Sequence, residues 1–108
     1  MIPYGRQHVD DDDIAAVVAV LKGDWLTRGP AVEEFEARLC EVTGARHAVA
    51  FANGTAALHG ATYAAGLGPG DTVYTSPLSF AASANCARYV GAQAAFVDID
   101  RALSLIHI

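Results

Sequence analysis

Apolar residues recur at helical spacing in the first part of the chain. Between Asp10 and Leu21 the aliphatic side chains fall at positions i, i+3, i+4 and i+7 and form one stripe (Ile14, Val17, Val18 and Leu21). Asp10 suits the N-cap of this helix, and Gly23 suits its end. The acidic run that ends at Asp13 would place carboxylates at the positive end of the helix dipole, so we expect a solvated helix start.

A second helix is predicted from Pro30 to Gly44. Proline fits the first position of a helix, where its missing N–H would have no partner in any case. The following residues give a partly apolar face (Val32, Phe35 and Leu39). The stretch Trp25–Gly29 between the two helices is predicted to be a loop.

The pattern then changes to short apolar runs that alternate with helices. The predicted elements are strands at 47–52, 72–75 and 95–99 and helices at 56–67 and 80–89. Gly68–Asp71 is a strong turn signal between the first of these helices and the second strand. Strands and helices in this order indicate right-handed crossovers and a parallel sheet, and therefore the α/β class.

Composition excludes several classes of function. A net charge of −5 in 108 residues argues against a nucleic-acid or anionic-membrane partner. No apolar run reaches the roughly 18 to 20 residues that span a bilayer, and the first residues lack the apolar core of a signal peptide. Cys40 and Cys86 show no metal or redox spacing, so we expect buried thiols, no metal site and a cytoplasmic protein.

The turn from Asn53 to Thr55 is the first candidate for chemistry. It follows a predicted buried strand and begins a predicted helix. Free N–H groups at a helix start, together with the helix dipole, form an anion site, and Gly54 would let a phosphate approach closely. The Thr55 hydroxyl adds a donor at the sheet edge where ligands of open α/β sheets bind. The same residues are also consistent with a simple helix cap supplied by Asn53.

The second candidate is Phe80, in a segment that starts at Thr75 and would place hydroxyl groups and an aromatic ring at the same rim. Phe80 could stack on a flat cofactor ring, or it could be a core residue that opens the following helix. The four histidines show no metal-ligand spacing. Lys22, the only lysine, lies beside the end of the first helix, where nothing marks it as a Schiff-base residue.

Several stretches of the chain occur in an order and spacing typical of one protein family. They are Trp25–Pro30 with Val32, Phe35 and Glu36; Ala52–His59; Gly66–Asp71; Thr75–Pro77 with Phe80; and Phe96–Asp100. Together they resemble the DegT/DnrJ/EryC1/StrS sugar aminotransferases of the aspartate-aminotransferase fold, from Met1 to about Asp100. Three further stretches resemble the branch of this family that makes a precursor of pseudaminic acid (Ile2–Gln7, Asp24–Thr27 and Ser83–Tyr89).

The resemblance implies a fold, a cofactor and roles for particular residues. The fold would be a partial large domain of the PLP type I class, preceded by two N-terminal helices. Asn53, Gly54 and Thr55 would hold the phosphate of pyridoxal 5′-phosphate (PLP). Phe80 would stack on the pyridine ring, and Tyr4 and Thr27 would approach the substrate. The implied reaction, in a homodimer, transfers an amino group from glutamate to C4 of a UDP-linked 4-keto-6-deoxy-N-acetylhexosamine.

In this family the Schiff-base lysine and the aspartate that pairs with the pyridine nitrogen lie downstream of the position of Asp100. We therefore expect an amino-terminal fragment, inactive by itself, with no catalytic residue of its own. It would comprise a helical segment at 1–45, the start of the PLP-binding α/β domain at 46–100 and a non-native tail of a truncated reading frame at 101–108. An ordinary terminal strand is the alternative for the tail. The alternatives for function are a non-catalytic phosphate- or nucleotide-binding α/β module, a plain structural domain and a lysine-less PLP sugar dehydratase.

Overall fold

The structure, a computed structural model, describes residues 5–100 and 102 of the chain. It divides into two compact units, Met1–Ala50 and Phe51–Ile108. The described residues form four helices and a two-stranded sheet, which confirms the α/β class. The division falls inside the apolar segment 47–52, whereas the sequence placed the domain boundary at residue 45.

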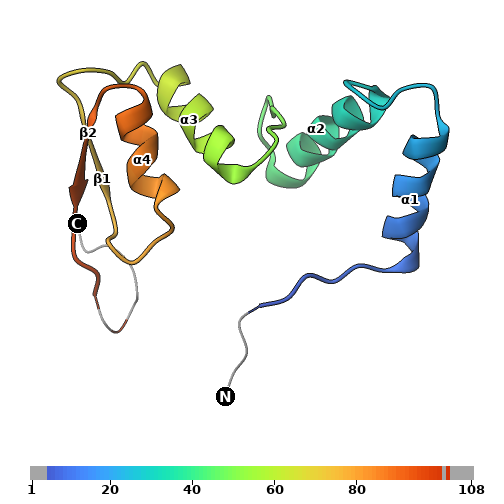
Figure 1. The fold of residues 1–108 in the computed structure, drawn as a ribbon, viewed down its shortest axis with the longest axis horizontal. Coiled ribbons are helices and arrows are strands. Elements are labelled where there is room, and N and C mark those ends of the chain that lie inside the picture. The colour runs from blue at the N-terminus through green and yellow to red at the C-terminus, as the bar shows by residue number, and fades with distance from the viewer. Residues whose placement is uncertain (1–4, 101, 103–108) are drawn as a thin grey trace. The chain divides into compact units, whose positions relative to one another are not determined.

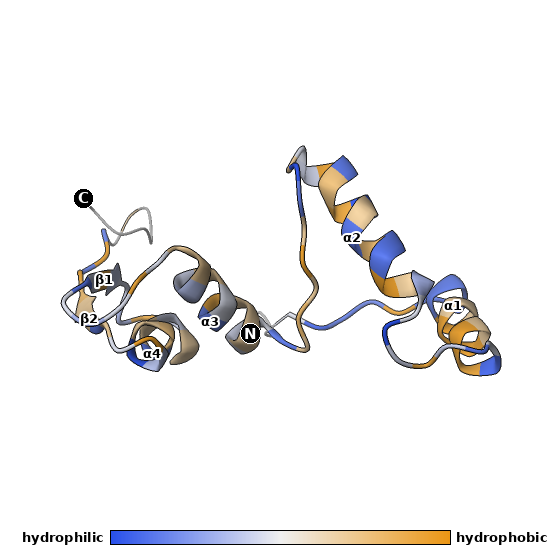
Figure 2. Cartoon of the chain, turned by 90° about the horizontal axis from the view of Figure 1, so that it is seen from above, coloured by the Kyte–Doolittle hydropathy of each residue, from blue (hydrophilic) through white to orange (hydrophobic). Residues whose placement is uncertain are grey.

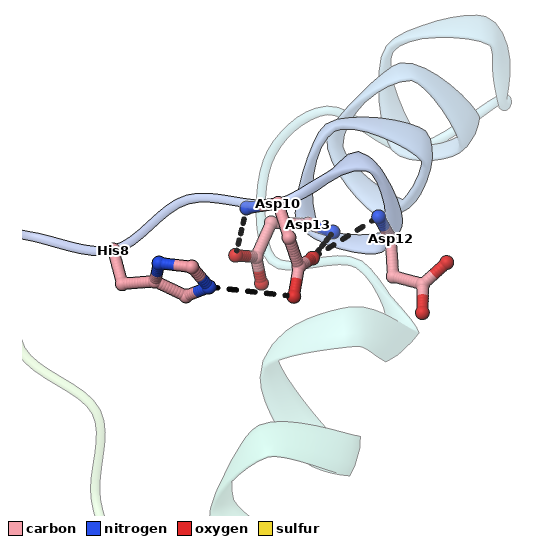
Figure 3. A network of polar contacts seen from close by, with 4 residues as sticks. All are labelled: His8, Asp10, Asp12 and Asp13. Atoms are coloured by element: carbon pink, nitrogen blue, oxygen red, sulfur yellow. Dashed lines mark hydrogen bonds and ion pairs between the residues drawn. The ribbon is translucent and has the colours of Figure 1, made fainter.

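The first helix of the first unit, α1 (Asp11–Lys22), begins where the sequence predicted. One carboxylate oxygen of the N-cap Asp10 accepts hydrogen bonds from the N–H groups of Asp12 and Asp13, both at 3.1 Å. The Asp10 N–H in turn donates to the Asp13 carboxylate at 3.1 Å. Figure 3 shows this capping box, with the His8 Nε2 4.0 Å from the Asp10 carboxylate. The acidic run therefore satisfies N–H groups that a first helical turn leaves unpaired.

The second helix of this unit, α2 (Pro30–Thr43), also has the predicted limits. It ends at Gly44, whose φ of 71° lies in the left-handed region that glycine enters without a Cβ clash. Beyond this glycine, the Ala50 N–H donates to the Glu36 carboxylate at 2.7 Å. This bond ties the segment after α2 back to the helix.

The second unit is built on a parallel strand pair. β1 (Thr72–Thr75) pairs with β2 (Gln93–Phe96), with Thr72 opposite Gln93 and Thr75 opposite Phe96. The helix α4 (Ala82–Tyr89) connects the strands and lies beside them in Figure 1, as a crossover between parallel neighbours requires. The buried apolar core of the described residues consists of small side chains in and just after this helix (Ala82, Cys86, Ala87 and Ala92).

The remaining helix, α3 (Gly54–Ala64), ends at a glycine. Gly66 has a φ of 75°, and the Leu67 N–H donates to the Thr62 carbonyl at 3.2 Å. This is the Schellman arrangement, in which a left-handed residue lets the chain satisfy the last helical carbonyls. The helix predicted at 56–67 ends earlier than expected, because the apolar pattern continues past the turn at Gly66. It also begins earlier, because Asn53 caps it.

The predicted turn at Gly68–Asp71 is present and sets the register of the sheet. The Asp71 N–H donates to the Gly68 carbonyl at 3.1 Å, and the Asp71 carboxylate accepts from the Gly68 N–H at 2.8 Å. Gly70 has a φ of 98°, as the third residue of a type II turn requires. The Asp71 carbonyl then accepts from the Gln93 N–H at 2.9 Å, which aligns β1 with β2.

The prediction of a strand at 47–52 is wrong for the described residues. A strand is defined by hydrogen bonds to a neighbouring strand, and the two strands of the described part bond to each other. The expected three-stranded sheet therefore has two strands there. The predicted strand at 95–99 is shifted to Gln93–Phe96, since the turn fixes Gln93 opposite Thr72.

Large apolar side chains stay exposed in both units. The α1 stripe has the predicted spacing, yet its members are 38% to 64% exposed (Ile14, Val17, Val18 and Leu21). Figure 2 shows apolar positions, in orange, interleaved with polar ones, in blue, on α1 and α2. Among the described residues, no helix is both long and apolar enough to cross a membrane.

Candidate functional site at the carboxyl end of the parallel strands

The start of α3 presents unused hydrogen-bond donors. Asn53 is the N-cap: its side-chain oxygen accepts from the Ala56 N–H at 2.9 Å, and its carbonyl accepts from the Ala57 N–H at 3.1 Å. Within the described part of the chain, the N–H groups of Gly54 and Thr55 and the Thr55 hydroxyl have no partner. The cap and the anion site, which the sequence offered as alternatives, therefore use different N–H groups and are compatible.

The surroundings of these donors suit an anion. Two consecutive N–H groups stand at the positive end of a helix, where a negative charge is stabilised. Gly54 is exposed, and a Cβ built on it would meet nothing within 4 Å. An anion can therefore approach the Gly54 backbone without meeting another side chain of the described structure.

A cleft of about 320 Å³ lies where β1 and β2 end. Its walls come from the loop after β1, the first turn of α4 and the last residue of β2, and they include Ser76, Ser79, Phe80, Ser83 and Phe96. Phe80 is 77% exposed, so it is not a core residue of the described structure. The face of its ring is available to a flat ligand.

Two serines brace the backbone around Phe80. The hydroxyl oxygens of Ser79 and Ser83 lie 2.8 Å apart, and the Ser83 N–H donates to the Phe80 carbonyl at 3.0 Å. Sequence reasoning did not single out Ser83. The sequence feature that could have indicated its role is the spacing of Ser79 and Ser83, which lie one helical turn apart with Phe80 between them.

Both features belong to one end of the second unit. Figure 1 shows α3 and α4 starting at the end where β1 and β2 finish. The helices pack on each other: the ring centroids of His59 and Tyr89 are 5.2 Å apart, and the Thr62 hydroxyl donates to the Cys86 carbonyl at 3.3 Å. His59 is thus engaged in helix packing. The donors of α3 and the aromatic cleft share the rim at which open α/β sheets bind ligands.

The roles predicted for Thr27 and Tyr4 stay predictions. Thr27 is exposed in the loop before α2 and belongs to the first unit. Tyr4 lies outside the described residues. The described residues contain no cluster of three or more His, Cys, Asp or Glu side chains that could hold a metal ion. Cys86 is buried as predicted, whereas Cys40 is only half-buried.

Comparisons with known proteins agree on one family. Residues 7–108 match the model of the DegT/DnrJ/EryC1/StrS aminotransferase family. The chain is 43% identical over 99 residues to the spore coat polysaccharide biosynthesis protein SpsC of Bacillus subtilis (strain 168), an overlap that covers 92% of this chain and 25% of SpsC. The family that the motifs suggested is therefore confirmed.

Solved structures give the same result at the level of the fold. The PLP form of Spr1654 from Streptococcus pneumoniae, assigned as a sugar aminotransferase, superposes with a TM-score of 0.83 at 33% identity, covering 92% of this chain and 25% of Spr1654. 3-Amino-5-hydroxybenzoic acid synthase superposes with a TM-score of 0.84 at 33% identity, covering 99% of this chain and 28% of the synthase. These likenesses confirm the predicted fold, a partial domain of a PLP-dependent aminotransferase.

The chain spans about a quarter of the length of the relatives that it matches. Aminotransferases of the matched family are PLP-dependent, and solved neighbours include PLP and PMP forms. From the family match over residues 7–108 and the identity to SpsC, the chain belongs to the DegT/DnrJ/EryC1/StrS aminotransferase family.

Proposed function

We propose that this chain is the amino-terminal, cofactor-binding part of a PLP-dependent sugar aminotransferase. The observation that carries the proposal is the pair of N–H groups of Gly54 and Thr55, which have no partner among the described residues. They stand at the start of α3, on the same rim as the cleft that Phe80 lines. Family membership supports PLP as the ligand.

The phosphate end of PLP fits the start of α3. The N–H groups of Gly54 and Thr55 and the Thr55 hydroxyl would donate to phosphate oxygens, and the helix dipole would stabilise the negative charge. The open space beside Gly54 supports this role, since a Cβ there would meet nothing within 4 Å. Asn53 would act mainly by holding the helix start, because its side-chain oxygen is bonded to the Ala56 N–H.

Phe80 would hold the pyridine ring by stacking. Its ring is 77% exposed and borders a cleft with several hydroxyl groups. Bound PLP supplies the electron sink that amino-group transfer needs. Tyr4 and Thr27 are proposed to contact the substrate, on the resemblance of the amino-terminal segments that carry them.

We assign the chain a binding role rather than the transamination itself. Covalent attachment of PLP needs a lysine, and such a lysine is normally desolvated in a pocket. Lys22 is the only lysine of the chain, and it is exposed at the last residue of α1. The 108-residue chain alone would therefore hold the phosphate and the ring without transferring an amino group. We further propose that the complete enzyme is a cytoplasmic homodimer.

For the reaction we propose transfer of an amino group from glutamate to C4 of a UDP-linked 4-keto-6-deoxy-N-acetylhexosamine. This is the activity of UDP-4-amino-4,6-dideoxy-N-acetyl-β-L-altrosamine transaminase, and the support is the resemblance of three stretches to that enzyme (Ile2–Gln7, Asp24–Thr27 and Ser83–Tyr89). SpsC is named for polysaccharide biosynthesis, which is compatible with a sugar substrate. Incubation of the complete enzyme with the keto sugar and glutamate should give the 4-amino sugar by mass spectrometry. A sugar dehydratase would instead remove a hydroxyl group from the sugar and add no amino group to the product.

The substitution Thr55→Ala in the complete aminotransferase tests the phosphate role. A hydrogen bond to a charged group contributes about 1.5 to 3 kcal/mol, so the Kd for PLP should rise about 10- to 150-fold. Titration of the apoenzyme with PLP, followed by protein fluorescence, measures this change. Thr55→Ser retains the hydroxyl and should bind PLP nearly as tightly as the wild type.

Thr62→Ala is the matched control for this experiment. This substitution removes a hydroxyl group from the same helix. The Thr62 hydroxyl lies away from the start of α3 and donates to carbonyl groups of α3 and α4. This variant should lose some stability and keep its affinity for PLP. Equal PLP affinity in Thr55→Ala and wild-type enzyme would refute the role proposed for Thr55.

A further inference from the structure

Ser83 contacts both residues that precede the N-cap of α4. Its hydroxyl oxygen lies 2.8 Å from the hydroxyl oxygen of Ser79, and its N–H donates to the Phe80 carbonyl at 3.0 Å. All three residues line the cleft at the carboxyl end of the strands. One side chain and its own backbone N–H therefore fix two consecutive residues of the loop.

Besides these contacts, the loop before α4 is held by a hydrogen bond from the Leu78 N–H to the Ser76 hydroxyl oxygen, at 3.1 Å. The N-cap of α4 is Ala81, which provides no side-chain hydrogen bond to the helix start. Phe80 is 77% exposed, so its ring is not held by packing in the described structure. A free loop would let the ring sample many orientations, and that freedom would be lost on binding a ligand.

We propose that Ser83 is a positioning residue, which holds Ser79 and Phe80 so that the ring already faces the cleft before the cofactor binds. This inference rests on the proposed function, since it assumes that Phe80 stacks on PLP. Ser83 itself would contact neither the phosphate nor the pyridine ring of PLP. Its effect on PLP passes through the Ser79–Ser83 hydrogen bond.

The test compares Ser83→Ala with Ser83→Thr in the complete aminotransferase. Loss of one neutral hydrogen bond should raise the Kd for PLP about three- to tenfold. It should also lower the visible circular dichroism of bound PLP, which reports how rigidly the ring is held in an asymmetric environment. Ser83→Thr keeps a hydroxyl and should restore both readouts. The structural control Thr62→Ala should lower thermal stability without altering the circular dichroism band.

A double-mutant cycle identifies the hydrogen bond itself as the cause. Ser79→Ala should produce the same change as Ser83→Ala, and the double variant should be no worse than the more affected single variant. If Ser83→Ala does not fold, Ser79→Ala in the exposed loop removes the same bond from the other side. Additive effects in the cycle would overturn the inference.

The outcomes separate this inference from the proposed function. Unchanged PLP affinity and circular dichroism in Ser83→Ala and Ser79→Ala, with weakened binding in Thr55→Ala, would overturn the positioning role alone. Unchanged binding in all three variants would overturn both proposals. A lower affinity and a weaker dichroism band in both serine variants, restored by Ser83→Thr, is the result that we expect.

Discussion

Substitution of Asn53 can separate the capping of α3 from anion binding. Asn53→Asp retains an oxygen that can accept from the Ala56 N–H, as Asn53 does at 2.9 Å, and aspartate caps helices about as well as asparagine. We therefore expect the free energy of unfolding to change by less than about 0.5 kcal/mol. Asn53→Ala removes the acceptor and should lower it by about 1 kcal/mol.

The carboxylate of Asn53→Asp would repel a phosphate bound by the neighbouring N–H groups of Gly54 and Thr55. At a separation of about 5 Å and the dielectric constant of water, two unit charges repel by about 0.8 kcal/mol. A phosphate monoester carries about 1.5 to 2 negative charges, which raises the repulsion to about 1.2 to 1.7 kcal/mol. The Kd for PLP should therefore rise about tenfold in a variant whose helix is intact.

The assay pairs PLP titration with thermal unfolding of the apoenzyme. Gln93→Glu is the matched control, because it makes the same amide-to-acid change at the exposed first residue of β2, the opposite end of the strand from the cleft. It should leave the Kd for PLP within about twofold of wild type, since the added charge is distant and screened. PLP binding by Asn53→Asp that is as tight as in the wild type would refute the placement of the phosphate at α3.

Two glycines give further predictions about stability, both measured by thermal unfolding of the complete protein. Gly66→Ala puts a Cβ at a φ of 75° and should destabilise the protein by about 1 kcal/mol. Gly66→Asn should destabilise it less, because asparagine enters the left-handed region more readily. A Gly66→Ala protein as stable as the wild type would contradict the left-handed cap. Gly60→Ala should also destabilise, although alanine favours helices, because the new Cβ would lie 2.5 Å from the Phe51 ring. A Gly60→Ala protein more stable than wild type would show that this ring moves aside freely.

Local signals were enough to predict the limits of α1 and α2 and one strand. The capping box of Asp10, the proline that starts α2 and the left-handed Gly44 each depend on residues close in sequence. The strand at Thr72–Thr75 follows a type II turn, which the glycines and the proline of the turn predict. The Asn53 cap was predictable for the same reason.

Features that depend on residues distant in sequence were less predictable. An apolar run such as 47–52 does not reveal whether a hydrogen-bonding neighbour strand is present. Phe80 could be a core residue or a ligand contact on its pattern, since both roles use aromatic residues. It is 77% exposed in the described structure, and its contact with a ligand stays a prediction. Ser83 was missed because its contacts with Ser79 and Phe80 depend on the turn before α4, which the sequence pattern does not show.

The central claim is that the start of α3 holds the cofactor phosphate, and a crystal structure of the complete aminotransferase with PLP tests it most directly. We predict phosphate oxygens within about 3.2 Å of the backbone nitrogens of Gly54 and Thr55 and of the Thr55 hydroxyl. The Phe80 ring should then lie against the pyridine ring. A phosphate bound elsewhere, with the Gly54 and Thr55 N–H groups facing solvent, would contradict the claim.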